Sequence, residues 1–104
     1  MKTLGIIDIG TGNLFSLTKS IKSLNIKIKI IENNTDLKEA DGLLIPGVGS
    51  FKSGMDNIQK SNIYKELLNF QILNKPILGI CLGMQLLLTE SMELGLYKGL
   101  NFIP

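Results

Sequence analysis

The sequence contains no histidine and no tryptophan, and its only cysteine is Cys81. One cysteine cannot form a disulfide within the chain, so the sequence favours a reducing, cytoplasmic location. A zinc site of the ordinary type is excluded as well, because it needs several cysteine or histidine ligands. We therefore expect neither a metal nor another cofactor in this protein.

Long apolar runs and a strong net charge are also missing. No run reaches the ~18 residues of a membrane-spanning helix. The apolar stretch near the N-terminus stops at Asp8, so it fits neither a secretory signal nor a transit peptide. The net charge is +2, and the lysines form no stripe interleaved with aromatic residues. We therefore expect neither a membrane nor a nucleic acid as a partner.

What remains is the composition of an ordinary globular domain. Apolar residues make up 44% of the 104 residues and charged residues 19%, a balance that argues against disorder. The length allows one domain at the small end of the usual range. No repeat, low-complexity stretch or linker divides the chain, so residues 1–104 are expected to belong to one unit.

Four short, continuous apolar runs predict strands that are buried on both faces. These runs cover residues 4–9, 26–31, 42–45 and 76–80. Other apolar residues recur every three or four positions, as in helices. The repeats are Leu14, Leu17, Ile21 and Leu24, then Ile63, Leu67, Leu68 and Ile72, and finally Met84, Leu87 and Leu88. The alternation predicts an α/β fold with an open, mostly parallel sheet and helices on both faces.

Three of the four expected strands end in glycine-rich turns, at residues 8–13, 46–50 and 79–83. Functional residues of parallel sheets gather at the carboxyl ends of the strands. The three turns are therefore expected to meet at one edge of the sheet and to form a functional site there.

Cys81 lies between the fourth expected strand and a helix expected from about Leu82. With Gly79 and Gly83 it forms G-x-C-x-G, the thiol counterpart of the G-x-S-x-G nucleophile elbow. Side chains two residues before or after the nucleophile would collide with the tight turn, and glycine removes them. A lone cysteine is otherwise more often a small buried apolar residue. Its flanks favour a nucleophile, with the amide of Leu82 directed toward a developing oxyanion.

The other two turns are less specific. The turn at residues 46–50 either ends the third strand or supplies a second oxyanion donor through its amides. Gly10 and Gly12 begin a G-x-G pattern, but Phe15 stands where the third glycine of a dinucleotide-binding loop belongs. The P-loop pattern is absent too, so no nucleotide is expected at the first turn.

Together, the three turns resemble a known family. Residues 75–87, KPILGICLGMQLL, are similar to the nucleophile segment of class I glutamine amidotransferases. Residues 7–14, IDIGTGNL, and residues 44–51, LIPGVGSF, resemble the glutaminase subunits of imidazole glycerol phosphate synthases. The residues that follow the nucleophile helix, 90–100, also fit that subfamily.

The resemblance implies an activity and a set of residue roles. Such enzymes hydrolyse L-glutamine through a γ-glutamyl thioester and pass the ammonia to a (β/α)₈ cyclase partner in histidine biosynthesis. The implied residues are Cys81 as nucleophile, Leu82, Val48 and Gly49 at the oxyanion hole, Gly47 and Gln85 at the glutamine site, and Gly10, Gly12 and Asn13 at the cyclase interface.

The sequence departs from the family in one respect. The family's cysteine works with a histidine and a glutamate, in an H-x-E arrangement further along the chain, and this sequence has no histidine. We therefore expect residues 1–104 to be the N-terminal part of one amidotransferase domain, inactive alone. The apolar residues 100–104 are expected to be an interrupted strand, and the sheet to keep an apolar edge.

Two other functions stay open. A redox or binding module of the ThiJ/PfpI type also carries a cysteine at an elbow, although residues 82–85 match the amidotransferases in detail. A non-catalytic subunit would only stabilise a cyclase. Individual residues also have simpler interpretations, since Gln85 would serve as a helix-surface residue and Asn13 as an N-cap.

Overall fold

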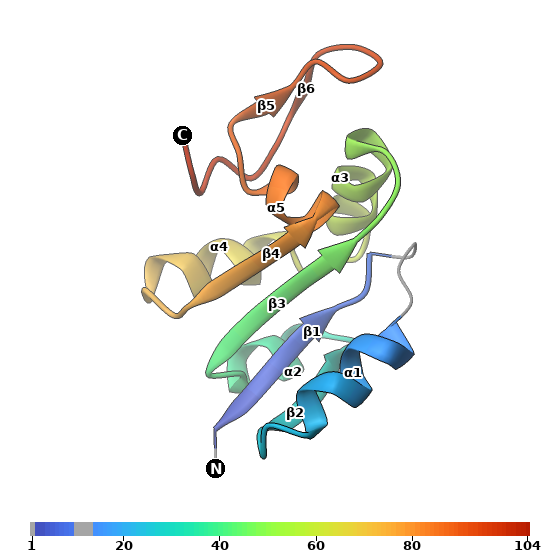
Figure 1. Cartoon of the computed structure of the whole chain (residues 1–104). Helices are drawn as coiled ribbons and strands as arrows, with labels where there is room; N and C mark the ends of the chain where they lie inside the picture. The colour runs from blue at the N-terminus through green and yellow to red at the C-terminus, as the bar shows by residue number, and fades with distance from the viewer. Residues whose placement is uncertain (1, 10–13) are drawn as a thin grey trace.

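The computed structural model describes residues 2–9 and 14–104, in which helices connect the strands of a sheet (Figure 1). In chain order the elements are β1 Thr3–Ile7, α1 Leu14–Lys22, β2 Lys27–Ile31, α2 Asn34–Glu39, β3 Gly42–Gly47, α3 Phe51–Lys60, α4 Tyr64–Ile72, β4 Ile77–Cys81, α5 Leu82–Leu86, β5 Glu90–Ser91 and β6 Tyr97–Lys98. The four predicted strands are confirmed as β1 to β4, with ends that differ by one or two residues.

The main sheet has four parallel strands in the order β2-β1-β3-β4. The central strand β3 is paired with β1 on one side and with β4 on the other. Its ladder with β4 runs from Leu43 opposite Ile77 to Gly47 opposite Cys81. The carboxyl ends of β3 and β4 therefore lie side by side, as the predicted parallel sheet requires.

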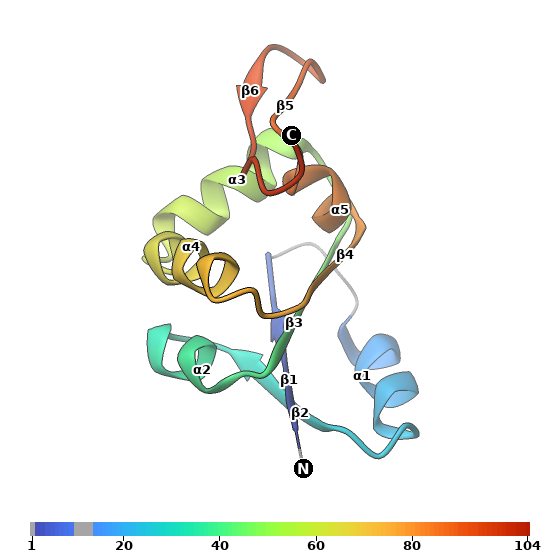
Figure 2. The ribbon, with the colours of Figure 1, turned by 90° about the vertical axis from the view of Figure 1, so that its left-hand side faces the viewer.

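Helices cover both faces of the sheet, but unequally (Figures 1 and 2). The helices α2, α3 and α4 lie on one face, and α1 lies on the other, over β1 and β2. The main hydrophobic core fills the space under α2, α3 and α4, where Ile45 and Leu43 of β3 meet buried residues such as Phe51 and Leu67. The predicted α/β architecture, with helices on both faces, is confirmed.

Two helices, α2 and α3, were not predicted from the sequence. Both begin with a polar cap, since the side chain of Asn33 accepts a hydrogen bond from the Asp36 amide at 2.9 Å. In the same way, Ser50 accepts one from the Ser53 amide at 3.2 Å. Such caps satisfy backbone donors that the first helical turn leaves free. Helix α2 is too short to give an apolar repeat, whereas α3 does have one, at Phe51, Met55 and Ile58.

The segment after α5 differs from the prediction. The helix expected to extend through Leu88 ends at Leu86, and Leu88 instead forms a single parallel bridge with Ile103. An antiparallel hairpin of β5 and β6 lies between them. The strand expected at residues 100–104 is wrong, since these residues make only the single bridge at Ile103. Leu100 is instead buried, and its amide donates to the carbonyl of Leu86 at 2.8 Å. No helix among the described residues is long and apolar enough to cross a membrane.

Candidate active site

Cys81 is the last residue of β4 and stands directly before α5. Its backbone has φ 54° and ψ −118°, a conformation outside the regions that residues with a side chain readily adopt. Holding such a residue costs about 1–3 kcal/mol, and this kind of strain concentrates at functional sites. The residue is exposed, so the interpretation of Cys81 as a small buried apolar residue is wrong. Strain and exposure together are what a nucleophile elbow requires.

The glycines that flank Cys81 have the packing role expected from the sequence. A β-carbon on Gly79 would come within 2.6 Å of the backbone nitrogen and Cα of Met84. A β-carbon on Gly83 would collide with the carbonyl oxygen of Ile45 in β3. The first turn of α5 therefore lies against the backbone of both strands, which is possible only because neither position has a side chain.

Gly47 stands opposite Cys81 at the end of β3. A β-carbon on Gly47 would collide with the side chain of Ile9 and would lie 3.6 Å from the β-carbon of Leu82. Residues that follow β1, β3 and β4 therefore do converge at one edge of the sheet. The rest of the first turn, including Gly10, Gly12 and Asn13, lies outside the described residues, and its role at a cyclase interface stays a prediction.

The residues predicted to hold an oxyanion lie at this same edge. Val48 and Gly49 directly follow Gly47, and Val48 is 56% exposed. Gly49 has φ 115°, which a residue with a side chain rarely adopts. Leu82 is the first residue of α5, so its amide has no acceptor within that helix. The loop after β3 and the start of α5 therefore lie beside Cys81, and the role of their amides in an oxyanion hole stays a prediction.

Gln85 lies one helical turn after Cys81 and is exposed. Residues four apart share one face of a helix, so Gln85 is on the side of α5 that continues from the nucleophile. This position suits a residue that contacts a bound substrate and also suits an ordinary surface residue. Its role in seating glutamine stays a prediction.

Two polar contacts at this edge were not found from the sequence. The carboxylate of Glu93, in the hairpin after β5, accepts a hydrogen bond from the amide of Phe51 at 3.0 Å. The side-chain amide of Asn57 in α3 donates to the carbonyl of Ile9 at 2.7 Å. Both contacts join segments more than 40 residues apart in the chain, so no local sequence pattern predicts them. They hold α3, and hence the loop of residues 48–50 before it, against the rest of the site.

The described residues offer no ready metal site, since no three of their acidic or cysteine side chains gather closely enough. The whole sequence has no histidine, so no imidazole of this chain can accept the thiol proton of Cys81. What the chain does assemble is a nucleophile with backbone donors beside it, which is one part of an acyl-transfer site.

Comparison with known proteins agrees with this geometry. The family model of class-I glutamine amidotransferases matches residues 5–97. The chain is 49% identical over 100 residues to imidazole glycerol phosphate synthase subunit HisH of Prochlorococcus marinus, covering 96% of this chain and 46% of that protein. The HisH subunit of Archaeoglobus fulgidus is 43% identical, with 97% and 49% covered. The chain therefore spans about half the length of these curated relatives.

Two solved structures share the fold. A Listeria monocytogenes crystal structure named for peptidase E superposes with a TM-score of 0.80 at 18% identity, covering 98% of this chain and 63% of that one. A glutamine amidotransferase crystal structure gives a TM-score of 0.72 at 20% identity, with 84% and 46% covered. Identities this low show the fold alone. The match of the family model to residues 5–97 and the identity to the HisH subunits show more, namely that the chain belongs to the class-I glutamine amidotransferase family.

Proposed function

We propose that this chain carries the nucleophile part of a glutaminase that supplies ammonia for the synthesis of imidazole glycerol phosphate in histidine biosynthesis. The observation that supports it most directly is the strained, exposed Cys81 opposite Gly47. It occurs in a chain that is 40–49% identical to proteins named as HisH subunits. The substrate is L-glutamine, and the partner is a (β/α)₈ cyclase in the reducing cytoplasm.

The chemistry begins at the sulfur of Cys81. The thiolate attacks the carbon of the glutamine side-chain amide, and a carbon–sulfur bond forms while the carbonyl oxygen becomes an oxyanion. Amides of Leu82 and of residues 48–49 stabilise that charge, an effect worth about 3 kcal/mol per donor in comparable sites. Ammonia leaves as the carbon–nitrogen bond breaks. Water then hydrolyses the thioester, which releases glutamate and restores the thiol.

Two proton transfers in this cycle need side chains that this sequence lacks. A base must accept the thiol proton, and an acid must protonate the departing nitrogen. Because the chain has no histidine, we infer that the histidine and glutamate of the family belong to the part of the relatives beyond the match. The chain by itself is then inactive. Gln85 seats the substrate, and Gly10, Gly12 and Asn13 contact the cyclase.

The test combines the chain with what it lacks. It is co-expressed with the remaining half of the Prochlorococcus marinus HisH subunit and with that organism's cyclase, and glutamate release is measured. We expect release that disappears in Cys81→Ala. A chloroketone analogue of glutamine should alkylate Cys81, and L-glutamine should slow the alkylation while L-asparagine should not.

Two outcomes would overturn the proposal. Rapid oxidation of Cys81 by peroxide, without alkylation by the glutamine analogue, would indicate a redox module of the ThiJ/PfpI type. An assembled complex with the cyclase that releases no glutamate would indicate a non-catalytic stabilising subunit. In both cases the elbow would be retained for a purpose other than glutamine hydrolysis.

A further inference from the structure

One half of the sheet is uncovered on the side of α1. In Figure 1, α1 lies in front of β1 and β2, whereas none of the helices that the structure describes lies in front of the middle of β3 and β4. Strand side chains alternate between the two faces, and Leu78 is paired in register with Leu44. Leu44 is 3% exposed, but Leu78 is 62% exposed and Ile80 is 37% exposed. The apolar surface therefore becomes open to solvent in passing from β3 to β4.

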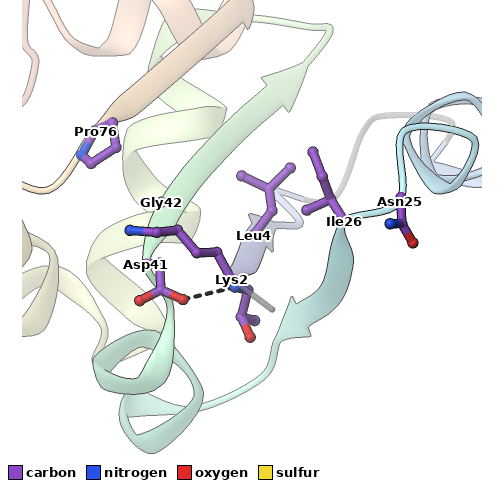
Figure 3. Close-up of a pocket in the computed structure, with 8 residues that line it drawn as sticks. Lys2, Leu4, Asn25, Ile26, Asp41, Gly42 and Pro76 are labelled. Atoms are coloured by element: carbon purple, nitrogen blue, oxygen red, sulfur yellow. Dashed lines mark hydrogen bonds between the residues drawn. The ribbon is translucent and has the colours of Figure 1, made fainter.

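A cavity extends this surface toward the amino ends of the strands (Figure 3). It has a volume of about 630 Å³, and its apolar lining includes Leu4, Ile26 and Pro76. At its rim, the carboxylate of Asp41 accepts a hydrogen bond from the amide of Thr3 at 2.8 Å. Pro76 precedes Leu78 by two residues, so both lie on the same face. We define the open sheet face as Leu4, Gly42, Pro76, Leu78 and Ile80.

The open sheet face has the width of one helix. Neighbouring strands lie about 4.8 Å apart, and a helix with its side chains is about 10 Å across, so a single helix covers two strands. The helix α1 is itself only partly packed, since its residues Leu17 and Ile21 are half-buried. All-parallel sheets occur almost only with both faces covered. A helix beside α1 would complete the cover of this face.

We propose that the open sheet face binds an amphipathic helix from a polypeptide that corresponds to the half of the HisH relatives beyond the match. The relatives are about twice as long as the matched region, which covers 46% and 49% of two of them. The solved structure with a TM-score of 0.80 also contains much more chain than the part that superposes, since only 63% of it is covered. Such a helix presents leucine-like side chains to Leu78 and the cavity, and polar ones to solvent.

This proposal does not depend on glutamine hydrolysis. It concerns the face of the sheet, whereas the nucleophile lies at the carboxyl edge. A complex that assembles but releases no glutamate would overturn the proposed function and leave the docking surface intact. Glutamate release without contact at Leu78 would overturn the docking surface and leave the proposed function intact.

The experiment co-expresses the chain with the remaining half of the Prochlorococcus marinus HisH subunit as a separate, tagged polypeptide. We expect a one-to-one complex in which carbene footprinting shows reduced labelling of Pro76 and Leu78. Leu78→Glu should weaken the complex at least about tenfold, because it places a charge in an apolar interface. Leu78→Ala, which adds no charge, should weaken it less but measurably.

Leu73→Glu is the matched control. Leu73 is 64% exposed, close to the 62% of Leu78, but it is the C-cap of α4, the helix that lies on the other face of the sheet from α1 (Figure 2). It should leave the affinity unchanged. Because Leu78 is exposed, Leu78→Glu should also retain the circular dichroism spectrum and the urea midpoint of the parent chain.

Three results would overturn the proposal. The first is that no complex is recovered on co-expression. The second is that Leu73→Glu weakens the complex as much as Leu78→Glu, which would place the contact elsewhere. The third is that the chain forms a dimer by itself that Leu78→Glu dissociates in sedimentation, which would make a second copy the occupant.

Discussion

Gly83 in α5 lies so close to Ile45 in β3 that a β-carbon on the glycine would collide with the isoleucine carbonyl oxygen. The two residues belong to the helix that follows the nucleophile and to the strand that carries the loop of residues 48–50. Their approach fixes how far the start of α5 can move from β3.

Gly83→Ala is therefore expected to destabilise the chain by more than about 2 kcal/mol, in the range of severe core overpacking. The direction of this change in the free energy of unfolding is informative, because alanine in place of glycine within a helix ordinarily stabilises by about 1 kcal/mol. Urea unfolding followed by circular dichroism measures the difference.

The control for that variant is Gly42→Ala. Its added β-carbon would meet Pro76 Cγ at 3.6 Å, which is ordinary van der Waals contact. A change within about 0.5 kcal/mol is expected there. Equal losses in the two variants would show that Gly83 is not specially constrained.

The backbone strain at Cys81 leads to a second prediction. Glycine is normally less stable than alanine by about 0.5–1 kcal/mol at ordered positions. At φ 54° and ψ −118° the order should reverse, because glycine tolerates positive φ without a steric penalty. We expect Cys81→Gly to unfold at a higher urea concentration than Cys81→Ala.

Neither variant retains the thiol, so the comparison isolates the backbone from the chemistry. Cys81→Ser serves as the reference, since it keeps a side chain of similar size. If Cys81→Ala proves the more stable of the pair, the elbow conformation is not strained and its stability has another origin.

A third prediction concerns the hydrogen bond from the Phe51 amide to the Glu93 carboxylate, 3.0 Å long. Glu93→Ala leaves that donor without its partner and should cost about 1–2 kcal/mol. Glu93→Gln keeps an acceptor oxygen and should cost less than half as much. The amide resonance of Phe51 in a nitrogen-15 correlation spectrum should move strongly in Glu93→Ala and slightly in Glu93→Gln.

Glu39→Ala provides a control for loss of a carboxylate, because Glu39 is exposed and is the last residue of α2. It should leave the Phe51 resonance in place. A Phe51 resonance that is unchanged in Glu93→Ala as well would contradict the contact.

The pair Lys52 and Asp56 gives a prediction on pH. Their side chains form a hydrogen bond of 2.7 Å one turn apart on α3. The hydrogen bond from Lys52 lowers the pKa of Asp56, and the same contact raises the pKa of Lys52. The aspartate contribution is present above its unfolded pKa and is lost as pH falls through the lowered value. The lysine contribution is present below its unfolded pKa and is lost as pH rises through the raised value.

The difference in thermal midpoint between the parent chain and Asp56→Asn should therefore be constant from about pH 5 to 9 and shrink on either side. Both groups are solvent-exposed, so the difference should be small and should vanish in about 1 M salt. A difference that persists in high salt would point to a helix effect of the substitution rather than to the ion pair.

The sheet and the elbow were predictable because each rests on local signals. Continuous apolar runs mark strands that are buried on two faces, and glycine on both sides of Cys81 marks a helix packed against strand backbone. The caps at Asn33 and Ser50 were not identified from the sequence. Helix α2 has only six residues and gives no apolar repeat, whereas the repeat of Phe51, Met55 and Ile58 in α3 was available and could have predicted that helix. Val48 and Gly49 lie beside the nucleophile because they directly follow Gly47, which is paired with Cys81.

The contacts of Glu93 and Asn57 could not be predicted, because each depends on where distant segments meet. The helix expected to extend through Leu88 failed for the same reason. Leucine is a good helix former, yet the bridge between Leu88 and Ile103 and the burial of Leu100 hold the chain in another path. Tertiary contacts outweighed local preference at these positions.

The pairing of Gly47 with Cys81 has a consequence for how this site can change in evolution. A shift of β4 along β3 by one residue would turn every side chain of that strand to the other face. It would also move the sulfur away from the amides after Gly47. A mutation that changed the register of β4 would therefore also change the position of the nucleophile. Changes in substrate or partner are therefore expected in the loops. The pairing of β3 with β4 can change only by whole residues, and each such step would displace the nucleophile.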